Sequence, residues 1–262
     1  CRSVAVLAYF AAVEYTDLQE SINTLHKVFS KALPKGNGEL PNLQAATLLM
    51  HSAALQGFHL LLGVTYQEDV LARAPSLLAE MKSVLESREL EMRTEVGTGV
   101  ALIYELARLH SPEFRWRGGG QLLEELNELA TDSHKHRGKK ERKHQRAVFR
   151  SVVTSIEDEE YTPETVTIGC KKAKGLLTID SWQLKYKYDC VCHVLEMGIN
   201  AHLLYNEELC TNFEVRDCSD KEGDTKKERN IQRRYNDLVQ KQRILQRNKN
   251  RDNRAIASTY ED

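Results

Sequence analysis

The sequence predicts a mainly α-helical fold, completed by a small α+β unit and a basic C-terminal helix. Three observations indicate this. Apolar residues recur at helical spacing from residue 4 to about residue 129. Two short runs rich in β-branched residues follow within residues 165–180, and the stretch after residue 228 is basic with a thin apolar stripe. At 262 residues the chain is long enough for one or two domains with a sizeable core.

The first half divides into helices at its turn residues. Residues 4–33 form one helix, or two with a break near residues 15–17, and the sequence PKGNG at 34–38 ends this segment. Helices of such length joined by short turns are typical of stacked helical pairs, so we expect an armadillo- or HEAT-like helical domain over residues 1–133. Further helices of this domain are expected at residues 42–63, 66–88, 96–110 and 121–130.

The next segment carries the most basic run of the chain, HKHRGKKERKHQRAVFR. Leucines precede the run at helical spacing, and Val148, Val152 and Ile156 follow it at intervals of four. We therefore expect residues 134–156 to form one long basic helix that links two domains, with its middle facing solvent. Gly138 is expected to kink this helix, at a cost of about 1 kcal/mol relative to Ala.

The character of the sequence changes after the acidic residues 157–160. The runs TVTIG and LLTID, separated by CKKAKG, predict a β-hairpin. Asp180-Ser181 then caps a helix that begins at Trp182 and carries apolar residues toward a core. A further helical stretch is expected at about 200–213. The expected divisions are a small α+β domain at 157–217, a linker at 218–227 and a basic helix at 228–254.

The net charge of −1 conceals a polarised molecule. Residues 134–150 carry eight Lys or Arg and one Glu, and residues 221–254 also have a net charge of +7, whereas the rest of the chain has a net charge of −15. No uninterrupted apolar run reaches the length of a membrane span. The six cysteines show no evenly spaced framework, so we expect reduced thiols of an intracellular protein.

The sequence offers little that indicates catalysis. Gly97-Thr98-Gly99 lacks the third glycine, the strand and the downstream acid of a dinucleotide site, so we expect a helix-entry turn. Cys190-Val191-Cys192-His193 lacks the usual CxxC spacing of a zinc site, and its cysteines project about 200° apart on a helix, which favours core thiols. The acids at 157–160 are expected to be a solvated loop. We expect no enzymatic activity, no cofactor, no metal site and no small-molecule substrate.

The basic run has two readings. On a helix, Lys135, Lys139, Arg142, Arg146 and Arg150 form one row at i,i+3/i+4 spacing, with Lys140 and Lys143 adjoining, and such a row can follow phosphates. A short cluster of Lys and Arg is also typical of a nuclear localisation signal. The second basic block favours nucleic acid. Without a base-reading motif, recognition of backbone and shape on a large structured RNA is favoured.

The order of segments resembles one family. The basic run, TPETVTIG, LLTIDSW, KYKYD, VLEMGINAHLLYNEEL and the terminal RRYN and NKNRDNRA are similar to the interferon-related developmental regulator family. The likeness covers most of residues 120–254. The first 120 residues fit the armadillo-type helical domain of that family less distinctively.

The resemblance implies a non-enzymatic regulator. Proteins of this family are associated with binding to translationally inactive ribosomes and with transcriptional co-regulation. The first association implies a cytoplasmic translational repressor, or ribosome hibernation factor, whose basic helix contacts ribosomal RNA and whose C-terminal helix lies in the mRNA path, while the body covers tRNA sites. The second implies a nuclear protein-interaction scaffold. The residues expected to contact RNA are Lys135, Arg137, Lys139, Lys140, Arg142, Lys143, Arg146, Arg150, Arg229, Arg233, Arg234, Lys241, Arg243, Arg247, Lys249, Arg251 and Arg254.

Overall fold

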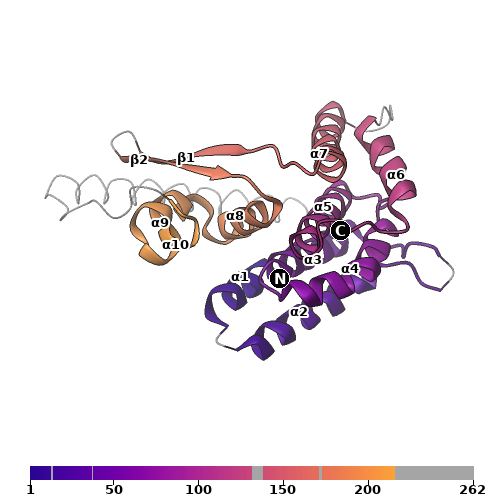
Figure 1. Ribbon diagram of the computed structural model, residues 1–262, viewed down its shortest axis with the longest axis horizontal. Helices are drawn as coiled ribbons and strands as arrows, with labels where there is room; N and C mark the ends of the chain where they lie inside the picture. Colours follow the sequence, from indigo (N-terminus) through magenta and orange to yellow (C-terminus); the bar gives the residue numbers. More distant parts are fainter. Residues whose placement is uncertain (13, 37, 132–137, 171–172, 216–262) are drawn as a thin grey trace, which may run out of the picture. The chain divides into compact units, whose positions relative to one another are not determined.

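The computed structural model describes residues 1–12, 14–36, 38–131, 138–170 and 173–215 (Figure 1). The chain divides into two compact units. Unit 1 comprises Cys1–Glu164 and Thr178–Val194, and unit 2 comprises Thr165–Leu177 with the described residues from Leu195 onward. The predicted mainly α-helical class with a small two-stranded antiparallel sheet is confirmed.

Unit 1 is a stack of helices in which each of the helices α1–α7 packs against a helix one or two places away in the sequence. The central helices are α3 and α5: α3 packs against α1, α2 and α5, and α5 packs against α3, α4 and α7, while α6 covers α7. This arrangement agrees with the predicted helical-pair architecture. The helices are α1 (Arg2–Ala11), α2 (Tyr15–Phe29), η1 (Ser30–Ala32), α3 (Ala45–Leu62), α4 (Gln67–Lys82), α5 (Leu90–His110), α6 (Gly119–Thr131), α7 (Lys139–Glu157) and α8 (Trp182–Leu195), the last of which belongs to unit 1 as far as Val194.

Helix α3 is the core helix of unit 1. Within the described part of the chain it is the one helix whose length and mean hydropathy would suit a membrane span, but most of it is buried inside unit 1. Leu55, Phe58 and Leu61 have almost no exposed surface. A helix that is apolar on all sides is typical of a protein core, which explains its composition here.

The helix predicted at 134–156 is present from Lys139 onward as α7, but Gly138 is not part of it, and residues 134–137 lie outside the described residues. Helix α6 ends at Thr131 and α7 begins at Lys139. Gly138 has an extended backbone (φ −57°, ψ 142°) and is the N-cap of α7, where its carbonyl accepts the first helical bond from the Arg142 amide at 3.1 Å. Because α6 packs against α7, the chain reverses direction between them rather than continuing. Gly138 therefore starts a helix and does not kink one.

The expected helix-entry turn at Gly97-Thr98-Gly99 is also wrong, because these residues lie inside α5. A Cβ at Gly97 would lie 2.6 Å from the Phe149 ring of α7, and a Cβ at Gly99 would overlap the His59 ring of α3. The two glycines are therefore sites of close helix packing, where α5 must accept an aromatic ring from each neighbour.

The predicted hairpin and the helix that follows it are confirmed. Strands β1 (Glu164–Cys170) and β2 (Ala173–Ile179) form the sheet. At the start of α8 the Ser181 hydroxyl accepts a hydrogen bond from the Leu184 amide at 3.2 Å, as an N-cap does. Trp182, Tyr186 and Val191 of α8 are buried as expected, whereas Leu195 is only partly buried.

Unit 2 contains η2 (Glu196–Gly198), α9 (Ile199–Tyr205) and α10 (Glu207–Asn212). The Asn206 side chain caps α10 by accepting hydrogen bonds from the amides of Glu208 and Leu209 at 3.1 and 3.2 Å. The helical stretch expected at about 200–213 is thus two short helices. Apolar residues that are buried in unit 2 include Ile168, Leu177, Ile199, Leu203, Leu209, Cys210 and Phe213.

Helix α8 packs in unit 1, although the sequence places it in a separate domain at 157–217. The Glu105 carboxylate of α5 accepts hydrogen bonds from the amides of Trp182 and Gln183 at 2.8 and 3.0 Å. The Trp182 indole donates to Ser155 of α7 at 2.7 Å. These contacts anchor the N-terminus of α8 to two helices of the stack. The domain limits at 133, 156 and 217 otherwise stay predictions.

Glu105 leads to a testable pH dependence. Burial raises the pKa of the Glu105 carboxyl, although the two amides partly offset this. The folded protein therefore holds this proton more tightly than the unfolded chain, so the stabilisation is fully present below the ordinary pKa and is lost as the pH rises through the raised value. We expect the unfolding free energy of wild type minus that of Glu105→Gln to fall as the pH rises from 4 to 7 in urea titrations.

The exposed Glu113 provides a control for the loss of one carboxyl. Measuring Glu113→Gln over the same pH range shows how much of the change is due to losing any one surface carboxyl. If the unfolding free energy of wild type instead rises with pH relative to that of Glu105→Gln, the prediction is contradicted, since the two amides would then outweigh the cost of burying the charge.

Candidate nucleic-acid interface

Helix α7 has a stripe of buried residues and a stripe of charged residues, and the members of each stripe follow one another at helical spacing. Gln145, Phe149, Val152 and Ile156 follow one another at intervals of four, three and four, and all four are buried. This spacing keeps them within about 60° of one another around the helix. The prediction from Val148, Val152 and Ile156 found the correct side of the helix but missed the Gln145 and Phe149 positions, because Val148 is only partly buried.

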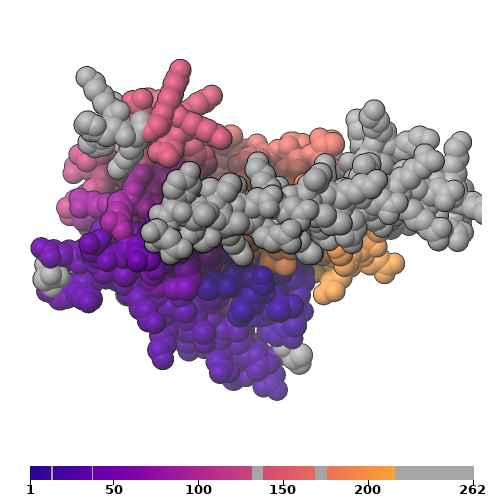
Figure 2. Space-filling view, turned by 180° about the vertical axis from the view of Figure 1, so that it is seen from behind, coloured from indigo at the N-terminus to yellow at the C-terminus, as the bar shows by residue number. Residues whose placement is uncertain are grey.

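Four cations follow the same spacing on a neighbouring face. Lys139, Lys143, Arg146 and Arg150 lie at intervals of four, three and four, and form what we call the cationic ridge. The ridge is about 16 Å long and its stripe is centred about 120° from the buried stripe. Lys139, Lys143 and Arg150 are exposed and Arg146 is partly exposed. Figure 2 shows long side chains projecting from the pink α6–α7 region into solvent.

The ridge cations lack carboxylate partners within the described residues. Elsewhere in unit 1 basic side chains are paired: Lys82 with Glu125 at 3.4 Å and Lys185 with Glu164 at 3.1 Å are examples. No ion pair of this kind involves the four ridge residues in the part of the chain that the structure describes. Their charge is therefore available to an external anion.

Two further predicted cations flank the ridge: Lys140, expected beside the row, and Arg142, expected in it. Lys140 is exposed beside the ridge. Arg142 is only partly exposed, and its Nε is buried without a hydrogen-bond partner among the described residues. Its carbonyl accepts a hydrogen bond from the Arg146 Nε at 3.3 Å. The Arg142 side chain thus lies partly against the protein, so it is less accessible to an external anion than the sequence suggested.

Helix α7 packs on a surface of α5 and α6 that we call the α7 seat. The apolar part of this seat is the contact of Phe149 with α5. Phe149 is fully buried, and its ring lies directly over Gly97. A residue with a side chain at Gly97 would push the ring, and α7 with it, away from α5. No local pattern indicates this contact, since it joins residues about fifty positions apart.

The polar part of the seat is a buried pair one turn away. Gln145 and Arg93 each have 2 % or less of their surface exposed. The Gln145 Oε1 accepts hydrogen bonds from the Arg93 Nε and Nη2 at 3.2 and 3.0 Å. Arg93 also donates to the Ser87 carbonyl at 2.5 Å, and the Gln145 amide donates to the Leu129 carbonyl of α6 at 3.4 Å. The pair therefore ties α7 to α5, to α6 and to the turn before α5.

Part of the predicted interface lies outside the described residues. This holds for the cations Lys135 and Arg137 and for the linker expected at 218–227. It also holds for the basic helix expected at 228–254, whose predicted RNA contacts are Arg229, Arg233, Arg234, Lys241, Arg243, Arg247, Lys249, Arg251 and Arg254. These assignments stay predictions.

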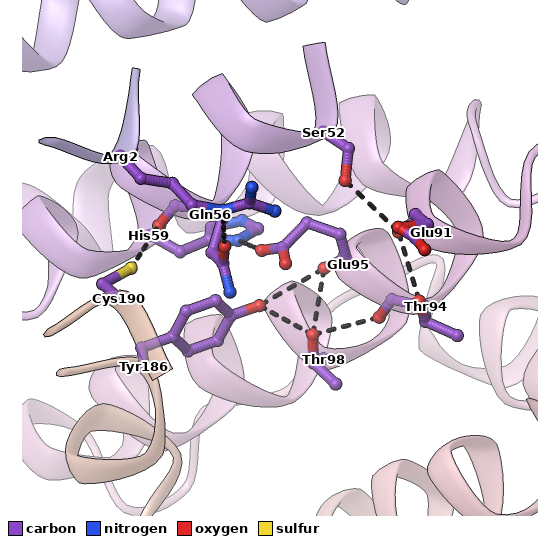
Figure 3. Close-up of polar contacts among 10 residues, drawn as sticks. All are labelled: Arg2, Ser52, Gln56, His59, Glu91, Thr94, Glu95, Thr98, Tyr186 and Cys190. Atoms are coloured by element: carbon purple, nitrogen blue, oxygen red, sulfur yellow. Dashed lines mark hydrogen bonds and ion pairs between the residues drawn. The ribbon is translucent and has the colours of Figure 1, made fainter. Parts of the chain in front are cut away.

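A second polar cluster lies inside unit 1, where α3, α5 and α8 meet (Figure 3). The His59 Nδ1 lies 2.9 Å from the Glu95 carboxylate, and the Tyr186 hydroxyl lies 2.7 Å from the Thr98 hydroxyl and donates to the Glu95 carbonyl at 3.3 Å. Burial raises the pKa of Tyr186 well above its ordinary value. His59 and Tyr186 are almost fully buried, so this cluster joins the three helices and is closed to a substrate.

The cysteines of α8 fit a structural role. Cys190 is buried beside this cluster, where its thiol donates to the Gln56 carbonyl at 3.9 Å (Figure 3), whereas Cys192 is partly exposed. Burial raises the pKa of both thiols. Among the residues that the structure describes, no three His, Cys, Asp or Glu side chains are grouped as a metal site requires.

The acidic run after α7 is exposed, as predicted. One of its members is engaged: Glu159, which has a positive φ of 61°, accepts a hydrogen bond from Arg115 at 3.0 Å and lies 3.5 Å from Arg108. These two cations lower the pKa of the Glu159 carboxyl. The run therefore fixes the end of α7 to the loop after α5.

Comparisons with known proteins identify the family. The family model of the interferon-related developmental regulators matches residues 1–157, so the match ends at the last residue of α7. Over 259 residues, 97 % of this chain, the sequence is 30 % identical to interferon-related developmental regulator 1 of Mus musculus and of Homo sapiens. Over 213 residues, 80 % of this chain, it is 34 % identical to interferon-related developmental regulator 2 of Mus musculus.

The extent of these matches differs from the resemblance seen in the sequence. The first 120 residues appeared less distinctive, yet they lie within the family-model match. The chain spans 57 % and 56 % of the two regulator 1 relatives and 47 % of the regulator 2 relative. The alignments cover 97 % of this chain for regulator 1 and 80 % for regulator 2, and the first 157 residues match the family model. The chain belongs to the interferon-related developmental regulator family.

Proposed function

We propose that this protein binds ribosomes and represses translation without catalysing a reaction. In this proposal the cationic ridge contacts ribosomal RNA, and the basic segment at 228–254 occupies the mRNA path while the body covers tRNA sites. The observation that carries the proposal is the ridge itself: four cations in one stripe on a firmly seated helix, without carboxylate partners among the described residues. The relatives are likewise named as regulators.

The ridge suits the backbone of a folded RNA. Each Lys or Arg that neutralises a phosphate releases condensed counterions, so binding weakens steeply with salt. A row of cations on a rigid helix presents charge in a fixed direction, which favours recognition of shape and backbone over base edges. A ribosome offers such a surface over a large area. We therefore expect the protein to be cytoplasmic and ribosome-associated, with ribosomal RNA as its main partner.

Co-sedimentation with purified 80S ribosomes over a salt series tests the proposal. We expect the logarithm of the affinity to fall linearly with the logarithm of the salt concentration, by roughly 0.7–0.9 per phosphate contact. Deleting residues 228–262 should weaken the exclusion of a labelled mRNA more than it weakens sedimentation with the ribosome.

An absence of ribosome binding at every salt concentration would contradict the proposal. Capture of protein partners by the same preparation would then favour the alternative, a nuclear transcriptional co-regulator whose helical domain is an interaction scaffold and whose basic run is a localisation signal.

A further inference from the structure

We infer that Arg93 and Gln145 are positioning residues for the cationic ridge, and that they fix the rotation of α7 about its own axis. This inference rests on the proposed function, which it extends to two buried residues that contact no RNA. Both lie in the core, with 2 % or less of their surface exposed, and they are joined by two hydrogen bonds at 3.2 and 3.0 Å.

The seat of α7 consists of two contacts one helical turn apart. Arg93 meets Gln145, and four residues further along each helix Gly97 meets Phe149. Because both numbers rise together, the two helices run in the same direction at this interface. Two contacts at matched spacing define both the position of α7 along α5 and the face of α7 that meets α5.

The two contacts differ in how strictly they fix the rotation of α7. An aromatic ring over a glycine requires close approach, but an apolar interface tolerates repacking by neighbouring apolar residues. Val148 and Val153 lie on either side of the buried stripe and could fill such an interface after a small rotation. A buried polar group that must find its partner is the device that fixes register in helical assemblies. Gln145 is the polar member of this stripe.

Both ends of the Gln145 amide are used. Its oxygen accepts from the Arg93 guanidinium and its nitrogen donates to the Leu129 carbonyl of α6 at 3.4 Å. A rotation of α7 by one residue, about 100°, would break these bonds inside the core, where an unsatisfied polar group costs about 1–3 kcal/mol. The same rotation would turn the cationic ridge by about 100° from the direction in which it now points into solvent.

The decisive variant is Gln145→Met, which has a similar size and removes no charge. If Gln145 positions the ridge, the variant should bind 80S ribosomes with a salt slope lower by about 1–2 units, since fewer phosphates are contacted at once. Arg93→Lys, which keeps the charge but loses the planar fork, should lower the slope in the same direction. A role confined to stability would leave the slope of the folded protein unchanged.

Leu25→Ala in α2 is the control for stability. Leu25 is buried on a helix that does not pack against α7, and its truncation is expected to destabilise the fold at least as much. This variant should keep the wild-type slope. Gly97→Ala displaces α7 by a different route, through the Phe149 ring, and should lower the slope even if Gln145→Met proves too unstable to purify.

The same variants applied to immobilised heparin provide a readout that needs no ribosome. We expect Gln145→Met and Arg93→Lys to elute at lower salt than wild type, and Leu25→Ala to elute with wild type. Wild-type slope and wild-type elution for Gln145→Met would overturn the inference while leaving the proposed function intact. If the wild type does not bind ribosomes, the proposed function is refuted. The heparin elution would still decide whether Gln145 and Arg93 position the ridge.

Discussion

Reversing the charge of the three exposed ridge residues, in the variant Lys139→Glu/Lys143→Glu/Arg150→Glu, is expected to abolish tight ribosome binding. We expect the salt slope to fall by about 3 units, because each residue neutralises about one phosphate. The affinity should fall by roughly 100-fold or more, since a hydrogen bond to a charged group contributes on the order of 1.5–3 kcal/mol. Co-sedimentation with 80S ribosomes at several salt concentrations measures both quantities. Arg142 is left unchanged because it is only partly exposed.

A matched control separates the ridge from net charge. Lys27, Lys31 and Lys35 are also exposed, and they lie on or just after α2, which Figure 1 places at the other end of unit 1 from α7. Reversing these three charges changes the net charge by the same amount. We expect near wild-type binding. An equal loss of affinity in both triple variants would show that overall charge, rather than the ridge, governs binding.

Truncating Phe149 to Ala is expected to have the largest effect on stability. The side chain is fully buried against Gly97, and a Phe→Ala change in a core costs about 3–5 kcal/mol through lost burial and a residual cavity. This is a large part of the 5–15 kcal/mol that is typical of a whole domain. Urea unfolding followed by circular dichroism measures the loss.

Two comparisons make this prediction specific. Leu7→Ala, at a position 67 % exposed, should change the unfolding free energy by no more than about 0.5 kcal/mol. Gly97→Ala should be destabilising in the wild type, because the new Cβ meets the ring, but nearly neutral in the Phe149→Ala background. Additive effects of the two changes would contradict the close contact between the two residues.

Local patterns predicted the elements that depend on local chemistry. Helical periodicity located the helices of unit 1, the β-branched runs located the hairpin, and Ser181 located the start of α8. In each case the neighbouring residues in the sequence decide the structure. Periodicity likewise found the correct side of α7, since Val152 and Ile156 of the predicted apolar spacing are buried.

Glycines and buried polar residues were misread because their roles are not local. Gly97 and Gly99 suggested a turn, but they are small so that rings from two other helices can approach. Gly138 suggested a kink in a helix that in fact begins there. Gln145 looked like one more polar residue in a basic run, although it is buried against Arg93. Only the tertiary structure brings such partners together.

The candidate site was predicted in part for the same reason. The spacing of the cations was visible in the sequence, but it placed Arg142 in the row and Lys143 beside it, whereas Lys143 belongs to the ridge with Lys139, Arg146 and Arg150. That the described residues offer them no carboxylate partner was not visible, since it depends on which acidic side chains of other helices lie nearby. The partly buried state of Arg142 was hidden too, because a helical projection does not show how deeply α7 is seated.

The return of α8 to unit 1 has a consequence for biosynthesis. The surface of α3 and α5 that receives Tyr186 and Cys190 stays uncovered until Val194 has been made, about thirty residues after Glu164. At about 5–20 residues per second this delay is about 1.5–6 s, which is long compared with helix formation and collapse. A nascent chain therefore passes through an incomplete helical stack in which this surface is not yet covered, and a chaperone that shields it during elongation would raise the yield of folded protein.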